Sequence, residues 1–406
     1  MRGIAWALLL VLAFSIPWEY SLDFGPPLGN VSRLVGLAVL LALIPALLHA
    51  GHMRRPGPLL WLTIPLLLWF GFSCFWSIDP EESVRHLRGT AQELMIVWFV
   101  WELVETPEDL RNVLRAYIAG AWVLAILTLG DFLFASSAAQ IRFVAEGQDP
   151  NDVARYLVLS LPPAALLVGA RGRWPGKLLA VGYLPLGFLG VLLTASRSGF
   201  LAALIALGGC AVLVFQAHRR AFTYGLYALP ALLAALWFTI PPQTFERIAS
   251  ITSELQGGDL NQRSNIWAAG WLAFTHAPFL GSGAGSFVAA AGLAPIDTAH
   301  NTALAYAVEG GIIALSLAVA IVAVTAAGIA RLRGPLRVAF ASSVAACLLG
   351  SLVATVQENR TTWLLLSLIA ATARLAAEEP IELARTFPGH AHHALLRLVA
   401  EPGGQP

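Results

Sequence analysis

The stretch NTALAYAVEGGIIALSLAVAIVAVTAAGI, residues 301–329, indicates how this chain folds. It holds one charged side chain, Glu309, and it exceeds the roughly 20 mostly apolar residues that an α-helix needs to cross a bilayer. Of all 406 residues, 57% are hydrophobic and 12% are charged, which is more apolar surface than one soluble core covers. The sequence therefore predicts an all-α, polytopic integral membrane protein.

Apolar windows of this length recur along the chain and predict about twelve transmembrane helices. They lie near residues 4–19, 29–50, 58–76, 91–105, 113–135, 153–170, 178–195, 199–216, 221–240, 301–329, 337–356 and 361–377. The first run follows Arg2 and resembles a signal peptide, but its small-residue pair lies inside the apolar run. We therefore interpret it as a retained span.

Basic residues gather in alternate loops between these spans. They are Arg54 and Arg55, Arg111 and Arg115, Arg171, Arg173 and Lys177, Arg219 and Arg220, and Arg331, Arg333 and Arg337. The positive-inside rule makes that side the cytoplasm and predicts cytoplasmic N- and C-termini. We expect one transmembrane domain over residues 1–377 and a cytoplasmic tail over residues 378–406. The tail histidines, His390, His392 and His393, lack a cysteine or nearby carboxylate that would complete a metal site.

The longest connection, residues 241–300, falls on the opposite side. Apolar residues recur at helical spacing from Arg263 to His276, and a tryptophan pair one turn apart favours the headgroup zone. We expect an interfacial helix there. The glycines that follow, Gly281, Gly283 and Gly285, fit a flexible connector, or else a backbone nest that binds an anion.

Three cationic or titratable side chains lie on this same side of the predicted topology: Arg197, Arg263 and His300. An arginine at a helix end can snorkel to the headgroups, and an interfacial histidine can simply meet water. Arg263 opens a helix, where the dipole favours an anion, so a bound phosphate would explain its position. We therefore expect the three side chains to surround a phosphate. Glu309 is expected to pair with one of the arginines.

Several short motifs in residues 150–311 resemble the O-antigen ligase and polymerase superfamily in their order and spacing. They are Thr194–Gly199 (TASRSG), Arg263–Trp267 (RSNIW), Pro278–Gly283 (PFLGSG), Ala299–Asn301 (AHN), Glu309–Gly311 (EGG) and the segment Asp149–Ala154 (DPNDVA). The resemblance implies a GT-C-like glycosyltransferase domain in the bacterial inner membrane, with its active site in the periplasm. It also implies an undecaprenyl-diphosphate-linked glycan donor and no cofactor, nucleotide sugar or metal.

The resemblance also implies roles for individual residues. Arg197 and Arg263 would bind the diphosphate, and His300 would activate the acceptor hydroxyl as a base or only bind it. Asn301 would orient His300 or the sugar. The remaining substrate-binding candidates are Ser196, Asn151, Arg85, Arg88 and Glu309. Arg85 and Arg88, with His86, form a second basic patch in loop 77–90 that fits acceptor phosphates, although lipid headgroups would explain it equally well.

The expected activity is inverting transfer of O-antigen to lipid A-core oligosaccharide, the ligase reaction of lipopolysaccharide biosynthesis. An O-antigen polymerase is the alternative. A protein O-oligosaccharyltransferase is less favoured because such enzymes carry an additional periplasmic domain, and a lipid-linked glycan transporter is less favoured because no inverted repeats are visible. The expected partners are the lipid-linked donor, the lipid A-core acceptor and membrane lipids, with no nucleic acid.

Overall fold

The computed structural model describes residues 2–25, 28–135, 140–145, 147–253 and 262–388. Each predicted span overlaps a helix, although α4 begins well before its predicted span. The helices are α1 (Arg2–Ser15) continued by η1 (Ile16–Ser21), α2 (Val31–Ala50), α3 (Pro58–Ser73), α4 (Pro80–Leu103), α5 (Pro107–Leu133), α6 (Pro150–Gly169), α7 (Trp174–Leu193), α8 (Arg197–Ala217), α9 (Arg219–Thr239), α14 (Thr302–Arg331), α15 (Gly334–Ser351) and α16 (Arg360–Glu378).

Nine helices in this part of the chain are long and apolar enough to cross a membrane. The helix α3 is apolar but shorter, whereas α4 and α16 are long enough but carry several charged residues. The prediction of an all-α integral membrane protein is thereby confirmed. Four short helices complete the described chain: α10 (Pro242–Ala249), α12 (Arg263–His276), α13 (Phe287–Ala290) and α17 (Pro380–Thr386). The predicted helix over 263–276 is α12, with the expected bounds.

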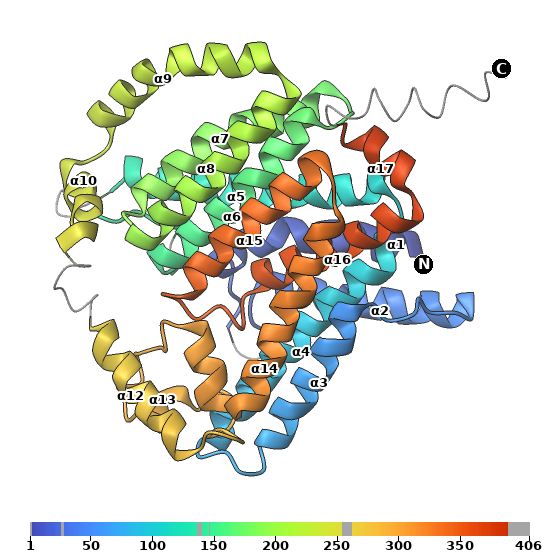
Figure 1. Cartoon of the computed structure of the whole chain (residues 1–406), viewed down its shortest axis with the longest axis vertical. Coiled ribbons are helices and arrows are strands. Elements are labelled where there is room, and N and C mark those ends of the chain that lie inside the picture. The colour runs from blue at the N-terminus through green and yellow to red at the C-terminus, as the bar shows by residue number, and fades with distance from the viewer. Residues whose placement is uncertain (1, 26–27, 136–139, 146, 254–261, 389–406) are drawn as a thin grey trace, which may run out of the picture.

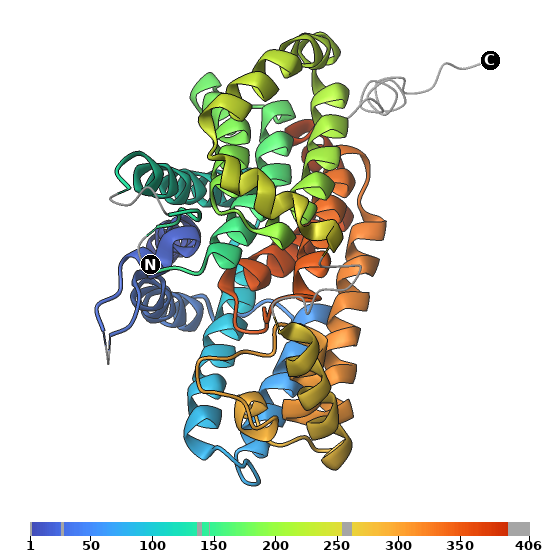
Figure 2. The ribbon, with the colours of Figure 1, turned by 90° about the vertical axis from the view of Figure 1, so that its left-hand side faces the viewer.

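The helices form two groups stacked along the long axis of the molecule (Figures 1 and 2). In one group α6 lies at the centre against α5, α7, α8 and α15, and its side chains from Val153 to Val168 are all buried. The other group packs α14 against α3 and α12. The helix α9 has no buried residue and lies at the rim in Figure 1. Its apolar surface is therefore available to lipid.

Polar side chains cap several helices where they begin on one side of the bundle. Asp149, Ser196, Asn301 and Asn359 each accept a hydrogen bond from a backbone N–H in the first turn of α6, α8, α14 and α16. Such caps satisfy N–H groups that have no partner within the helix, and each stabilises its helix by about 1 kcal/mol. This side also carries α10 and α12, so we call it the outer side.

The helix α14 is interrupted at Gly311, whose φ of 65° and ψ of −164° are nearly exclusive to glycine. Residues 278–285, here called the glycine loop, pack against this break. The Ile312 N–H donates to the Pro278 carbonyl at 2.9 Å, and Ser282 N–H donates to the Val308 carbonyl at 2.8 Å. Gly283 N–H donates to the backbone carbonyl of Glu309 at 2.9 Å. The glycine loop is therefore neither a flexible connector nor an anion nest, because the N–H groups of residues 281–284 donate within the protein: those of Ser282 and Gly283 to α14, that of Gly281 to Ala277 and that of Ala284 to Ser73.

Replacing Gly311 with alanine tests this packing. An added Cβ would lie 2.1 Å from the Phe279 carbonyl oxygen and would hold a side chain at a positive φ. We expect Gly311→Ala to lower the free energy of unfolding by about 3 kcal/mol. Gly208→Ala is the control, because nothing lies within 4 Å of its added Cβ. Thermal unfolding in detergent measures both, and equal melting temperatures for the two variants would contradict the proposed packing.

Candidate active site

The three residues predicted as the site each stand at the outer beginning of a helix. Arg197 is the first residue of α8, Arg263 is the first of α12, and His300 lies two residues before α14. In the described residues, positive φ at non-glycine positions occurs only at Ala195 (49°), Gln262 (63°) and His300 itself (45°). Backbone strain of this kind collects at functional sites. All three instances therefore mark one candidate site.

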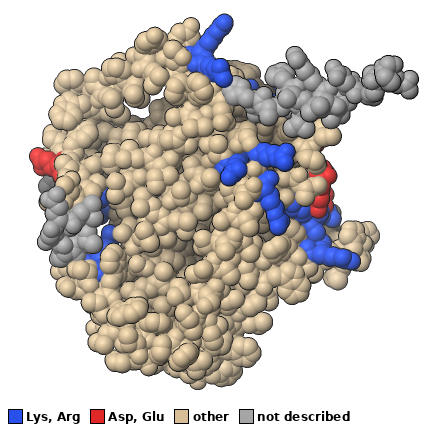
Figure 3. All heavy atoms as spheres, in the orientation of Figure 1, with Lys and Arg blue, Asp and Glu red and all other residues tan. Residues whose placement is uncertain are grey.

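Charge interactions link the three predicted side chains. The pKa of Arg263 is lowered by burial and then by the charge of Arg197, while Asp149 opposes the shift. The pKa of His300 is lowered by burial and then by the charge of Arg263, and Asp149 again opposes the shift. Arg263 is therefore within electrostatic reach of both others. Figure 3 shows basic side chains on this side between α10 and α12.

Two further arginines join them. Burial lowers the pKa of Arg142 to about 10, and Arg247 is the next largest cause. Asp149 acts against the shift, whereas Arg197 and Arg263 add to it. We call Arg142, Arg197, Arg247 and Arg263 the arginine cluster. Sequence reasoning missed two of its members, because neither Arg142 nor Arg247 lies in one of the motifs that carry the resemblance.

The two additional arginines support the turn that precedes α8. Arg142 Nε donates to the Thr194 carbonyl at 3.1 Å, and its Nη2 donates to Asn151 Oδ1 at 3.2 Å. Arg247 Nε donates to the Ala195 carbonyl at 3.2 Å. The strained Ala195 backbone is thus held by guanidinium groups from two other segments, and this fixes the start of α8.

Ser196 and Asn151 contact each other within this turn. Ser196 Oγ donates to Asn151 Oδ1 at 2.8 Å and also accepts from Gly199 N–H at 3.2 Å as the cap of α8. An added Cβ at Gly199 would lie 2.5 Å from the Ala154 Cβ, so only glycine lets α8 approach α6 this closely. Both predicted polar residues therefore position Arg197. Their direct contact with substrate stays a prediction.

Asn301 caps α14. Its Oδ1 accepts from Leu304 N–H at 2.9 Å, and its Nδ2 donates to the Leu352 carbonyl at 3.3 Å. The His300 ring lies beside Thr298, with Nδ1 at 3.3 Å from the hydroxyl oxygen. Asn301 therefore fixes the backbone that presents His300.

The predicted second basic patch is wrong as a unit. The helix α4 begins at Pro80, capped by Asp79, and so contains most of the expected loop 77–90. Arg85 is exposed and pairs with Glu82 at 2.5 Å, and Arg88 is exposed. His86 is buried, with Nδ1 2.7 Å from Glu358 Oε1. Neighbouring positions on a helix point to different faces, which separates His86 from the two arginines.

Glu309 also has partners that differ from those expected. Its carboxylate accepts from Gln357 Nε2 at 2.8 Å and lies 3.9 Å from His86 Nε2. In the described chain it forms no ion pair with an arginine. The expected pairing with Arg197 or Arg263 is therefore wrong, because the turn of α14 that carries Glu309 faces α4 and the loop before α16.

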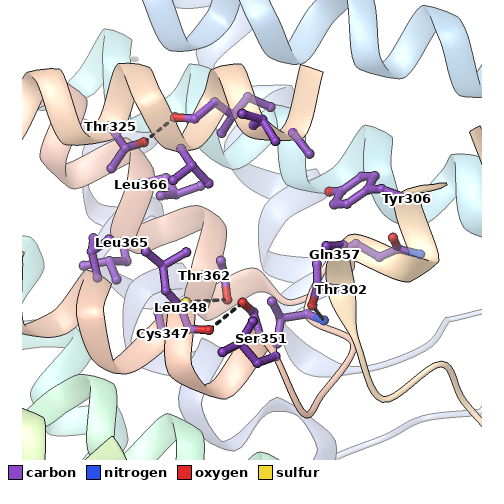
Figure 4. Close-up of a pocket in the computed structure, with 18 of the residues that line it drawn as sticks. Thr302, Tyr306, Thr325, Cys347, Leu348, Ser351, Gln357, Thr362, Leu365 and Leu366 are labelled. Carbon is purple, nitrogen blue, oxygen red and sulfur yellow. Dashed lines mark hydrogen bonds between the residues drawn. The ribbon is translucent and has the colours of Figure 1, made fainter. Parts of the chain in front are cut away.

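A cavity of about 560 Å³ lies between α14, α15 and α16. Figure 4 shows Thr302, Tyr306 and Gln357 at one end, and Thr325, Leu365 and Leu366 at the other. Its lining is largely apolar. Because Thr302 lies two residues after His300, the polar end of the cavity adjoins the candidate site.

A comparison with known protein families agrees with the motifs. A family model described as O-antigen ligase matches residues 182–319, which include Arg197, Arg263 and His300. The chain is also similar to one chain of a solved structure described as "Structural coordination of polymerization and crosslinking by a peptidoglycan synthase complex". They share 19% identity over 78% of this chain and 96% of that chain, with a TM-score of 0.41. No curated protein matches the chain. The family-model match over residues 182–319 confirms the resemblance for that part of the chain.

Proposed function

We propose that this chain is an O-antigen ligase, which transfers a glycan from undecaprenyl diphosphate to lipid A-core oligosaccharide on the periplasmic side of the inner membrane. One observation carries the proposal: the arginine cluster and His300 come together from segments far apart in the sequence. The O-antigen ligase domain supports the choice of reaction.

The charge of the cluster suits a diphosphate. Burial and mutual repulsion lower the pKa of Arg142 and Arg263, so each guanidinium pays a free-energy cost for its position. Asp149 is the acidic group that acts on both. A diphosphate between the guanidinium groups would replace repulsion with charge-assisted hydrogen bonds. The same contacts would stabilise the charge that develops on the leaving diphosphate.

The cavity beside the site suits the carrier's hydrocarbon chain. It is largely apolar, has a volume of about 560 Å³, and its polar end lies next to His300. A hydrocarbon chain in this cavity would place the carrier's diphosphate at the outer end of α14. The glycan would then extend away from the bundle on the outer side.

His300 suits the role of the base. Its lowered pKa keeps the imidazole neutral at pH 7, and a neutral imidazole can accept a proton. In the proposed single displacement, the acceptor oxygen forms a bond to the anomeric carbon from the face opposite the diphosphate. The bond from that carbon to the diphosphate oxygen breaks with its electron pair. His300 takes the hydroxyl proton, and the arginine cluster keeps the diphosphate.

Reconstituted turnover tests the reaction and its residues. Purified wild-type chain, given lipid-linked glycan and lipid A-core in EDTA without ATP, should form the conjugate. Replacing Arg197, Arg263 or His300 with alanine should slow this by about two to three decades, because a transition-state charge donor or the base is lost. Arg85→Ala, an exposed arginine paired within α4, is the matched control.

The products decide between related activities. Longer glycan on the carrier without any conjugate would indicate a polymerase instead. Movement of the carrier without bond formation would indicate a transporter. Wild-type turnover in any one of the three alanine variants would remove that residue from the site.

Binding of inorganic pyrophosphate tests the cluster apart from catalysis. Pyrophosphate should raise the melting temperature of the wild-type chain, and added salt should weaken the effect because the attraction is between charges. Removing one charge-assisted contact should weaken binding at least about tenfold in Arg197→Ala and Arg263→Ala. Arg85→Ala should bind as the wild type does. Equal stabilisation of all four proteins would contradict a diphosphate site at the cluster.

The pH dependence of turnover tests His300. Because burial and Arg263 lower its pKa, the neutral base persists below the usual value of 6.5, and the rate should fall only as the pH drops through the lowered pKa. Asp149→Asn removes a charge that favours the protonated ring and should move this acid limb to still lower pH. An acid limb above pH 6.5, or one that persists in His300→Ala, would show that another group titrates.

A further inference from the structure

A second charged pocket lies at the end of the bundle opposite the arginine cluster. Its volume is about 530 Å³, and it is lined by Glu108, Arg111, Arg171, Glu382, Arg385 and Thr386. These residues come from the start of α5, from the loop before α7, and from α17. Figure 3 shows basic side chains gathered on the side where α17 lies. None of these residues belongs to the proposed active site.

Hydrogen bonds join the three segments into one rigid rim. Arg111 Nη1 donates to the Arg171 carbonyl, and Arg171 N–H donates to the Thr386 carbonyl at 2.9 Å. Arg111 also pairs with Glu108, and Arg385 lies 3.4 Å from Glu382. The backbone of the rim is thus held without using the Arg171 guanidinium. That group remains on the surface, where it is exposed.

Positive charge exceeds negative charge at this pocket. Arg115 lies behind the rim and shares Glu108 with Arg111, its Nη1 being 3.9 Å from Glu108 Oε1. A Cβ at Gly172 would lie 2.4 Å from Arg115 Nη2, so this glycine leaves space for the guanidinium. Within the described chain, the buried Nε atoms of Arg111 and Arg115 have no hydrogen-bond partner. An anion at the pocket would therefore offset an excess of cations.

An apolar track begins beside the pocket. Trp174 opens α7 three residues after Arg171, and it is 69% exposed. Leu178 and Val181 follow on the same helical face and are 52% and 48% exposed. Both α5 and α7 are candidate membrane spans, so the pocket lies where their ends meet the headgroup layer. Tryptophan is enriched at that depth.

We propose that this pocket binds the headgroup phosphate of an anionic phospholipid, with an acyl chain along Trp174, Leu178 and Val181. Basic pockets between transmembrane helices bind acidic headgroups in this way. The exposed track favours a lipid over a soluble phosphate, because only a lipid also covers the apolar face of α7. The proposal is independent of the glycosyl transfer.

Lipid binding to the detergent-purified full chain tests this. Native mass spectrometry counts bound lipid, and the melting temperature reports stabilisation, with phosphatidylglycerol, phosphatidylcholine and inorganic phosphate as separate additions. We expect phosphatidylglycerol to bind and stabilise. The double variant Arg171→Ala with Arg385→Ala should weaken it about tenfold, since both guanidinium groups face the headgroup. Arg331→Ala with Arg333→Ala, exposed arginines at the α14–α15 connection, should leave binding unchanged.

Two further variants keep the test informative if the double variant unfolds. Arg385→Gln changes one exposed side chain and should weaken the binding of phosphatidylglycerol while leaving the melting temperature without lipid unchanged. Trp174→Ala should weaken the binding of phosphatidylglycerol but leave any effect of inorganic phosphate on the melting temperature unchanged. Equal binding of phosphatidylcholine, a response to inorganic phosphate that matches the response to phosphatidylglycerol, or an equal loss in the Arg331 and Arg333 control would each overturn the proposal.

Discussion

Repulsion among half-buried guanidinium groups is the constraint on which the outer side of this molecule depends. Arg142, Arg197, Arg247 and Arg263 act on one another, and Asp149 is the carboxylate that acts on Arg142, Arg263 and His300 alike. Such an arrangement persists only if other contacts hold it. The central helix α6, buried against α5, α7, α8 and α15, supplies the rigid body from which Asp149 and Asn151 project. Packing inside the bundle thus sustains unfavourable charge at its surface.

The strained backbone lies at or close to the residues of the candidate site in the sequence. Ala195, Gln262 and His300 adopt the left-handed conformation without being glycine, at a cost of about 1 kcal/mol or more each. At Ala195 the carbonyl accepts from Arg247, and the carbonyl of the preceding Thr194 accepts from Arg142. Strain in the chain and repulsion between side chains are therefore coupled at the same turn.

The sequence predicted the helices well because each span is a long apolar run that no soluble fold would require. It also predicted Arg197, Arg263 and His300 as one site, since their motifs fall on one side of the topology. Arg142 and Arg247 were missed because membership of the cluster depends on the tertiary packing of two polar segments, the loop before α6 and the helix α10. The partners of Glu309 and His86 were missed for a related reason. The start of α4 at Pro80 follows from its Asp79 cap, which an apolar window does not detect.

The break at Gly311 divides α14 into two halves that the glycine loop joins. Val308 in the outer half accepts from Ser282 N–H, and Ile312 N–H in the inner half donates to the Pro278 carbonyl, so the loop that follows α12 bonds to both halves. His300 stands at the head of the outer half, and Arg263 stands at the head of α12. In the proposed function the base and one phosphate ligand are therefore carried by segments that the glycine loop ties together, whereas Arg197 belongs to α8 in the bundle. The distance over which the sugar is passed would then be set by the packing of the glycine loop against α14.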